Sequence, residues 1–234
     1  MLLHGFPYDP HAFDAAIDPL VAQGLRVYVP YLRGYGPTRF RTAETPRSGQ
    51  QAALARDALD FMDALDIHTA TLAGYDWGGR AACIVAALWP ERVHGLVTVG
   101  GRLLWRLWSP TWQFSEETYA RSAASFDNPD FVDVVIQSYR HRYGYAPGDP
   151  ALEPIEAQLA QQPPIDVPTI ALYGMDDGVS PFRPADRPDA HFTGPYERRD
   201  VPGVGHNLPQ ESPKSLVSAI GDLIYHDRSE PRGR

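Results

Sequence analysis

The sequence is poor in cysteine: its 234 residues include one, Cys83, which excludes a framework of disulfide bonds within the chain. It has no secretory leader and no apolar run of about 18 residues, so we expect a cytoplasmic protein without a membrane segment. Basic side chains form no cluster, and the net charge is −8, which argues against a nucleic-acid partner. The histidines, aspartates and cysteine show no spacing typical of a metal site.

Strand-like and helix-like segments alternate along the chain. Strands are predicted at "LRVYVPYL" (25–32), "HTATLA" (68–73), "VHGLVTVG" (93–100), "VPTIALYG" (167–174) and "YERRDVPG" (196–203). Helices are predicted over 48–67, 78–89 and 212–226, where apolar residues recur at helical spacing. This alternation predicts an α/β protein with a mostly parallel sheet flanked by helices.

Residues 102–163 interrupt that alternation with many aromatics, helical stretches and proline-rich loops. We therefore expect an α/β core formed by residues 1–101 and 164–234, with residues 102–163 as a small helical cap above the sheet. The tryptophans of "WRLWSPTW" are expected to pack between cap and core; they are Trp105, Trp108 and Trp112.

The segment "AGYDWGGR" (73–80) connects a predicted strand to a predicted helix. Two glycines, Gly74 and Gly78, flank Asp76 at a distance of two residues on either side. This spacing is typical of a sharp turn that presents a nucleophile, usually serine, at the top of a sheet. The sequence therefore predicts Asp76 as a carboxylate nucleophile.

Two later loops carry groups that suit this nucleophile. "YGMDDGVSP" follows the 167–174 strand and offers Asp176 or Asp177, and "GVGHNLPQESP" follows the last strand and offers His206. The carboxyl ends of parallel strands meet at one edge of a sheet, so these side chains should lie close together. The chain order is nucleophile, acid, histidine.

With "HGFP" (4–7) and "LRGYG" (32–36), these motifs resemble the α/β-hydrolase fold family, in its epoxide hydrolase and haloalkane dehalogenase branch with an aspartate nucleophile. The resemblance implies Asp177 as the acid, with Asp176 as the alternative. It also implies an oxyanion hole formed by the backbone N–H groups of Phe6 and Trp77, and no cofactor.

An ionised aspartate needs no base to act as a nucleophile, because its ordinary pKa is about 3.9. It can attack a carbon that bears a leaving group and form an alkyl ester. We expect His206 to activate the water that cleaves this ester and Asp177 to orient the histidine. The function predicted is therefore epoxide hydrolysis to a diol.

The leaving group separates this reaction from its alternatives. An epoxide needs a proton donor, and the cap segment "VIQSYRHRYGY" resembles the tyrosine-bearing cap helix of epoxide hydrolases, with Tyr139 at the matching position. Many haloalkane dehalogenases have asparagine at the position of Phe6, and haloacid dehalogenases typically have arginine at the position of Trp77. Both differences favour an epoxide over a halide as the substrate. The alternatives are a haloalkane dehalogenase with the same covalent mechanism, or a non-catalytic ligand-binding or inactive relative. The aromatic cap suggests a partly apolar small-molecule substrate.

The pattern departs from the family at the start of the chain. The family has about thirty residues, with two strands, before the oxyanion loop, whereas here "MLL" precedes it. The sheet is thus expected to lack its N-terminal strands and to expose an edge, through which a homodimer could form. The segment leading into the cap is also short.

Overall fold

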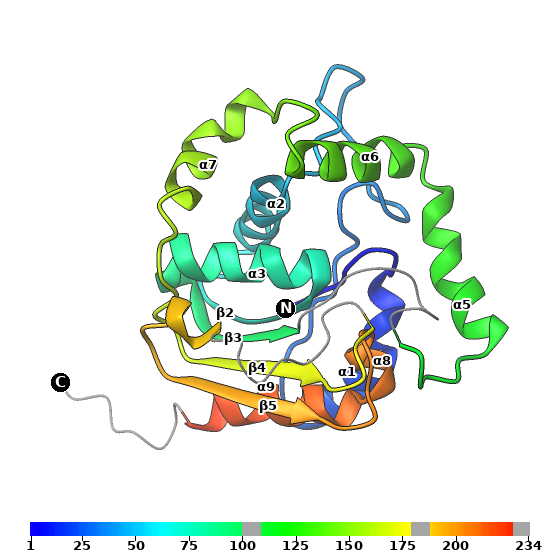
Figure 1. Cartoon of the computed structure of the whole chain (residues 1–234), viewed down its shortest axis with the longest axis vertical. Coiled ribbons are helices and arrows are strands. Elements are labelled where there is room, and N and C mark those ends of the chain that lie inside the picture. Colours follow the sequence, from blue (N-terminus) through cyan, green and yellow to red (C-terminus); the bar gives the residue numbers. More distant parts are fainter. Residues whose placement is uncertain (100–108, 179–187, 227–234) are drawn as a thin grey trace.

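The computed structural model describes residues 1–99, 109–178 and 188–226. Its centre is a five-stranded sheet whose strands are all parallel and lie in chain order (Figure 1). The strands are β1 (Leu2–Leu3), β2 (Ala70–Tyr75), β3 (Val93–Val99), β4 (Thr169–Gly174) and β5 (Tyr196–Val201). The predicted parallel sheet is confirmed, and β2 to β5 match four of the predicted strands to within about two residues.

Helices cover both faces of this sheet. On one face lie α2 (Gln51–Ala64) and α3 (Asp76–Leu88), and on the other lie α1 (Asp14–Ala22) and α9 (Pro213–His226) (Figure 1). A short helix, α8 (Leu208–Glu211), precedes α9. Single 3₁₀ turns occur at Pro10–Phe13, Pro90–Arg92, Ala124–Asp127, Pro150–Leu152 and Pro188–His191. The arrangement is the three-layer α/β architecture that the sequence predicts.

Side-chain alternation along the strands builds a separate core on each face. Leu72 of β2 and Leu96 of β3 join the apolar cluster beneath α2 and α3. Their neighbours Ala73 and Val97 join the cluster beneath α1 and α9. Successive residues of a strand point to opposite faces, so a sheet covered on both sides needs apolar residues at every position. This explains why β2, β3 and β4 are largely apolar along their length, whereas β5, at the edge of the sheet, is mostly charged.

The apolar residues of helix α2 pack against the core on one face of the sheet. Leu54, Ala58 and Met62 are buried, as their helical spacing predicts. Phe61 is half-buried against the same cluster. Leu65, which also fits this spacing, is 47% exposed and lies directly after the end of the helix at Ala64.

The predicted strand at 25–32 is not a strand in the structure. Among the described residues, its backbone contact with β1 is one hydrogen bond, from the Leu2 N–H to the Tyr28 carbonyl at 2.8 Å. A two-residue neighbour cannot supply a longer ladder, and Pro30 has no N–H to donate. The segment runs along the edge of the sheet without joining it. A homodimer through this edge stays a prediction.

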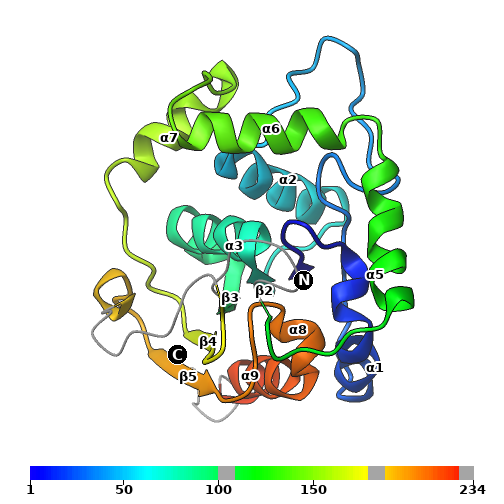
Figure 2. The same ribbon diagram turned by 45° about the vertical axis from the view of Figure 1, so that its right-hand side comes forward.

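Residues 109–163 include three helices that lie between β3 and β4 in the chain. They are α5 (Glu116–Ala123), α6 (Phe131–Arg142) and α7 (Glu153–Leu159). Figure 2 shows them as a run that arches past α2 and α3 rather than lying on the sheet. Trp112 packs against the apolar cluster beneath α1 and α9, whereas Trp105 and Trp108 lie outside the described residues. The division of the chain into core and cap stays a prediction.

Within the described ranges, the helices are too short or too polar for any of them to pass through a lipid bilayer.

Candidate active site

The turn between β2 and α3 places Asp76 at the carboxyl end of β2, the second strand of the sheet. Its φ angle is +50°, in the left-handed region that aspartate tolerates better than most residues. A Cβ on Gly74 would lie 2.5 Å from the Gly78 carbonyl oxygen, and a Cβ on Gly78 would lie 2.1 Å from that of Leu3. Both glycines are therefore required by close backbone approach, which is the physical basis of the "GYDWG" pattern.

The Asp76 carboxylate lies at the bottom of a closely packed site. It is 4% exposed, and its Oδ1 accepts a 2.8 Å hydrogen bond from the Phe6 N–H. The backbone N–H of Trp77, the next residue, also lowers the pKa of this carboxylate. Burial raises the pKa of Asp76 above its ordinary value, while His206, these two N–H groups and Arg80 oppose the rise. The structure thus brings the two predicted oxyanion donors to the predicted nucleophile.

Asp177 and His206 come together from the loops after β4 and β5. The Asp177 Oδ2 lies 3.1 Å from the His206 Nδ1, and both side chains are buried. Asp176, the alternative acid, is half-buried, and its backbone N–H donates to the Val204 carbonyl. The geometry therefore favours Asp177 as the partner of the histidine.

His206 also lies near the nucleophile. Its charge is among the groups that lower the pKa of Asp76, second only to burial in effect. Its ring centroid is 6.4 Å from that of Tyr75, the residue directly before Asp76. Nucleophile, histidine and acid thus share one end of the sheet, as their chain order predicts. Their catalytic roles stay predictions.

Tyr139 reaches the same region from α6. Its half-buried ring lies 5.8 Å from that of Phe6 and 6.0 Å from that of Trp77, measured between ring centroids. Tyr139 is therefore packed on Phe6, whose N–H group binds Asp76, and on Trp77, the residue directly after Asp76. Three other tyrosines of this segment are exposed and so are weaker candidates for the proton donor: Tyr119, Tyr143 and Tyr145, at 42%, 57% and 76%.

Several residues of this site were not predicted from the sequence. Tyr8 and Tyr35 are both fully buried, and burial together with the Asp76 charge raises the pKa of each hydroxyl well above its ordinary value. His4 is also buried, its Nε2 accepts from the Leu32 N–H at 3.1 Å, and burial lowers its pKa to about 4. These residues stand inside the quoted motifs "HGFP" and "LRGYG" or directly after them. Proximity to the motifs was the available signal.

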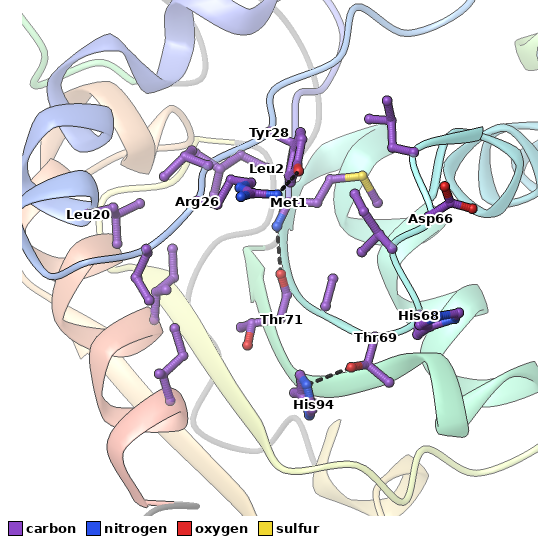
Figure 3. A pocket seen from close by; sticks show the side chains of 17 residues that line it. Met1, Leu2, Leu20, Arg26, Tyr28, Asp66, His68, Thr69, Thr71 and His94 are labelled. Carbon is purple, nitrogen blue, oxygen red and sulfur yellow. Dashed lines mark hydrogen bonds between the residues drawn. The ribbon is translucent and has the colours of Figure 1, made fainter. Parts of the chain in front are cut away.

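A separate pocket lies at the opposite end of the strands (Figure 3). Its volume is about 580 Å³, and it is lined by Ala70 and Thr71 at the amino end of β2, together with Met1 and Tyr28. Chemistry in parallel sheets gathers at the carboxyl ends, where Asp76 lies. This pocket is therefore not part of the candidate active site. Among the described residues, no three His, Cys, Asp or Glu side chains gather in a way that could hold a metal ion.

The fold corresponds to a known family. A family model described as the alpha/beta hydrolase fold matches residues 1–148 of the sequence. Because this match spans more than half of the chain, the chain belongs to the α/β-hydrolase fold family. The predicted fold class is thereby confirmed.

Individual relatives are more informative about the kind of hydrolase than the family model is. The crystal structure of a candidate epoxide hydrolase from Klebsiella pneumoniae is 43% identical, with a TM-score of 0.91 over 95% of this chain and 88% of that chain. The epoxide hydrolase 3 of Siraitia grosvenorii is 32% identical over 99 residues, which are 42% of this chain and 31% of the relative. The 2-hydroxy-6-oxononadienedioate/2-hydroxy-6-oxononatrienedioate hydrolase of Escherichia coli is 35% identical over 89 residues, 38% of this chain and 30% of the relative.

The matches to these two curated relatives thus span less than a third of each relative's length. All three similarities support a hydrolase, and the two first-named relatives support one that resembles epoxide hydrolases.

Proposed function

We propose that this protein hydrolyses epoxides to diols through an ester on Asp76. The observation that carries the proposal is the convergence at one sheet edge of Asp76, held by the Phe6 N–H, and the buried pair of His206 and Asp177. A carboxylate suits this chemistry because it attacks carbon without needing a base. The 43% identity to a candidate epoxide hydrolase supports the same class of substrate.

The first step forms the ester. One oxygen of Asp76 attacks an epoxide carbon, a new C–O bond forms, and the C–O bond of the three-membered ring breaks. The ring oxygen leaves as an alkoxide and takes the proton of the Tyr139 hydroxyl. The position of Tyr139 against Phe6 and Trp77 supports this role, because both residues border the nucleophile. General acids of this kind contribute about 10²–10⁴-fold.

The second step hydrolyses the ester. His206 accepts a proton from water, and the resulting hydroxide attacks the carbonyl carbon of the Asp76 ester. The negative charge on the former carboxylate oxygen is held by the N–H groups of Phe6 and Trp77. The intermediate collapses to the diol and the free Asp76 carboxylate, and the histidine proton returns to the Tyr139 phenolate. Asp177 stabilises the charged imidazole meanwhile. The sum is epoxide plus water giving diol, with no cofactor.

The test is intact-protein mass spectrometry of the His206→Gln variant. This variant should form the ester and fail to cleave it, so incubation with styrene oxide should add the mass of one epoxide, located by peptide mapping to Asp76. The wild type should release the diol and show little adduct. A His191→Gln variant is the matched control, since His191 lies in the 3₁₀ turn Pro188–His191, outside the candidate site, and should behave as the wild type.

The alternatives give different results in the same experiment. A bromoalkane that adds its alkyl group to Asp76 without bromine, while styrene oxide adds nothing, would replace the proposal with a dehalogenase. If folded His206→Gln protein gains no mass with either compound, the covalent mechanism is wrong and a non-catalytic binding protein becomes the better account.

A further inference from the structure

The loop that carries His206 is held by a carboxylate from outside the predicted triad. The Glu211 Oε2 accepts a 2.8 Å hydrogen bond from the Gly205 N–H, and its Oε1 accepts one of 3.0 Å from the Asn207 N–H. Glu211 ends the short helix α8, directly after the loop. One side chain therefore binds the backbone on both sides of the histidine.

A serine from the segment leading into the cap completes this arrangement. The Ser109 hydroxyl donates to the Glu211 Oε1 and accepts from the Asn207 N–H at 3.1 Å. Ser109 is 1% exposed, and it lies about a hundred residues away in the chain, in the connection between β3 and α5. The loop of His206 is thus tied to the part of the chain that enters the cap.

Close backbone packing around Gly205 fixes the same loop. A Cβ on Gly205 would lie 2.5 Å from the Ser109 Cα, so no larger residue fits there. On the other side, a Cβ on Gly174, at the end of β4, would lie 2.2 Å from the Gly205 carbonyl oxygen. The backbone before His206 is therefore clamped between the end of β4 and Ser109.

We propose that Glu211 and Ser109 are positioning residues that hold His206 in line between Asp177 and the nucleophile. The proposal rests on the function proposed above for His206. Glu211 binds two backbone N–H groups and one hydroxyl, and none of these contacts reaches Asp76. Its effect on the reaction is therefore expected through the histidine alone.

Glu211 also contributes charge near the histidine. Burial raises the pKa of the Glu211 carboxyl, whereas its hydrogen bonds to Ser109, Gly205 and Asn207 and the charge of His206 oppose this rise. Attraction between two charges is mutual, so an ionised Glu211 favours the protonated imidazole. The other groups facing His206 are Asp177 after β4, Asp76 at the start of α3, Tyr8 after β1 and Tyr75 of β2.

The two side chains can be separated by their effects. Glu211→Gln keeps the size of the side chain but removes the charge, and its amide cannot accept both N–H groups. Ser109→Ala removes the hydroxyl and leaves the charge. Both should loosen the loop, while only Glu211→Gln should shift the protonation of His206. Glu91→Gln, at an exposed position between α3 and β3, is the matched control.

The experiment uses the whole chain and three measurements. Nuclear magnetic resonance gives the hydrogen exchange of the Gly205 and Asn207 amides and the titration midpoint of the His206 ring. Mass spectrometry with styrene oxide gives the rates of ester formation and ester hydrolysis. The first two measurements do not depend on turnover, so they test the proposal even if His206→Gln traps no ester and the proposed function fails.

We expect exchange of both amides to be about tenfold faster or more in Glu211→Gln and Ser109→Ala. Ester hydrolysis should slow about tenfold in both, with ester formation within about twofold of the wild type. The His206 midpoint and the acid limb of ester hydrolysis should move to lower pH in Glu211→Gln and stay in place in Ser109→Ala. Unchanged exchange and midpoint in Glu211→Gln would overturn the proposal. Equal losses in ester formation and hydrolysis, with lower thermal stability, would indicate a structural role alone and would also overturn it.

Discussion

The Phe6 N–H donates a 2.8 Å hydrogen bond to Oδ1 of Asp76, across a separation of 70 residues in the chain. An amide side chain can accept the same bond but cannot attack an epoxide. Asp76→Asn should therefore keep this contact and form no ester with styrene oxide, even in the His206→Gln background. Mass spectrometry of the double variant checks the result, and any adduct on the same peptide would place the nucleophile elsewhere.

The melting temperature should show that the inactive Asp76→Asn variant is folded. Because the folded protein raises the pKa of Asp76, ionisation of this side chain costs stability above that pKa, and the wild type regains stability as the pH falls through it. The asparagine has no such cost, and it tolerates the positive φ of the turn. We expect the melting temperature of Asp76→Asn at pH 7 to equal or exceed that of the wild type, with the difference shrinking in acid. A variant that melts several degrees lower at pH 7 would contradict this.

Asp177 should act only on the second chemical step. Its carboxylate lies 3.1 Å from the His206 ring, so Asp177→Asn should slow ester hydrolysis by about 100-fold or more while ester formation continues. The adduct should accumulate in rapid-quench mass spectrometry. Asp176→Asn is the matched neighbour and should turn over normally. The opposite result would exchange the roles of the two aspartates.

Tyr139 should act on the first step instead. Tyr139→Phe keeps the ring that packs on Phe6 and Trp77 and removes the proton donor, so ester formation should slow by about 10- to 100-fold. Single-turnover kinetics measure this step directly. Tyr143→Phe, on an exposed tyrosine four residues further along the chain, should have no effect. Equal rates for Tyr139→Phe and the wild type would assign the proton donor to another group.

Arg80 should tune the pH at which Asp76 becomes reactive. Its charge lowers the pKa of Asp76, against the larger effect of burial. Removing that charge in Arg80→Gln should raise this pKa, so the acid limb of ester formation should move to higher pH. Arg80→Lys keeps the charge and should leave the limb in place. A shift to lower pH in Arg80→Gln would contradict the assignment of that limb to Asp76.

Local patterns predicted most of the layered fold correctly. The strand at 167–174 and the helix at 212–226 have apolar residues on the faces that become buried, and β4 and α9 form where those patterns stand. The prediction of a strand at 25–32 was wrong, because a strand needs a neighbouring strand with which to form backbone hydrogen bonds. The neighbour here, β1, has two residues. Whether a β-branched segment joins a sheet depends on its neighbours, and these lie elsewhere in the chain.

For the candidate site, too, some features follow from the local sequence and others from contacts between distant segments. The local sequence was enough to predict the turn at Asp76 and the order of the acid and histidine loops. Gly74 is a local requirement of that turn, because a Cβ there would meet the Gly78 carbonyl, whereas Gly78 is required by the Leu3 carbonyl of β1. The loop after β4 offered Asp176 or Asp177, the family resemblance implied Asp177, and the packing of the loops places Asp177 against His206. The contact of Ser109, from a distant segment, with Glu211 and the histidine loop is visible in the tertiary structure alone. Such contacts depend on how strands and loops pack in space, and no local spacing records that packing.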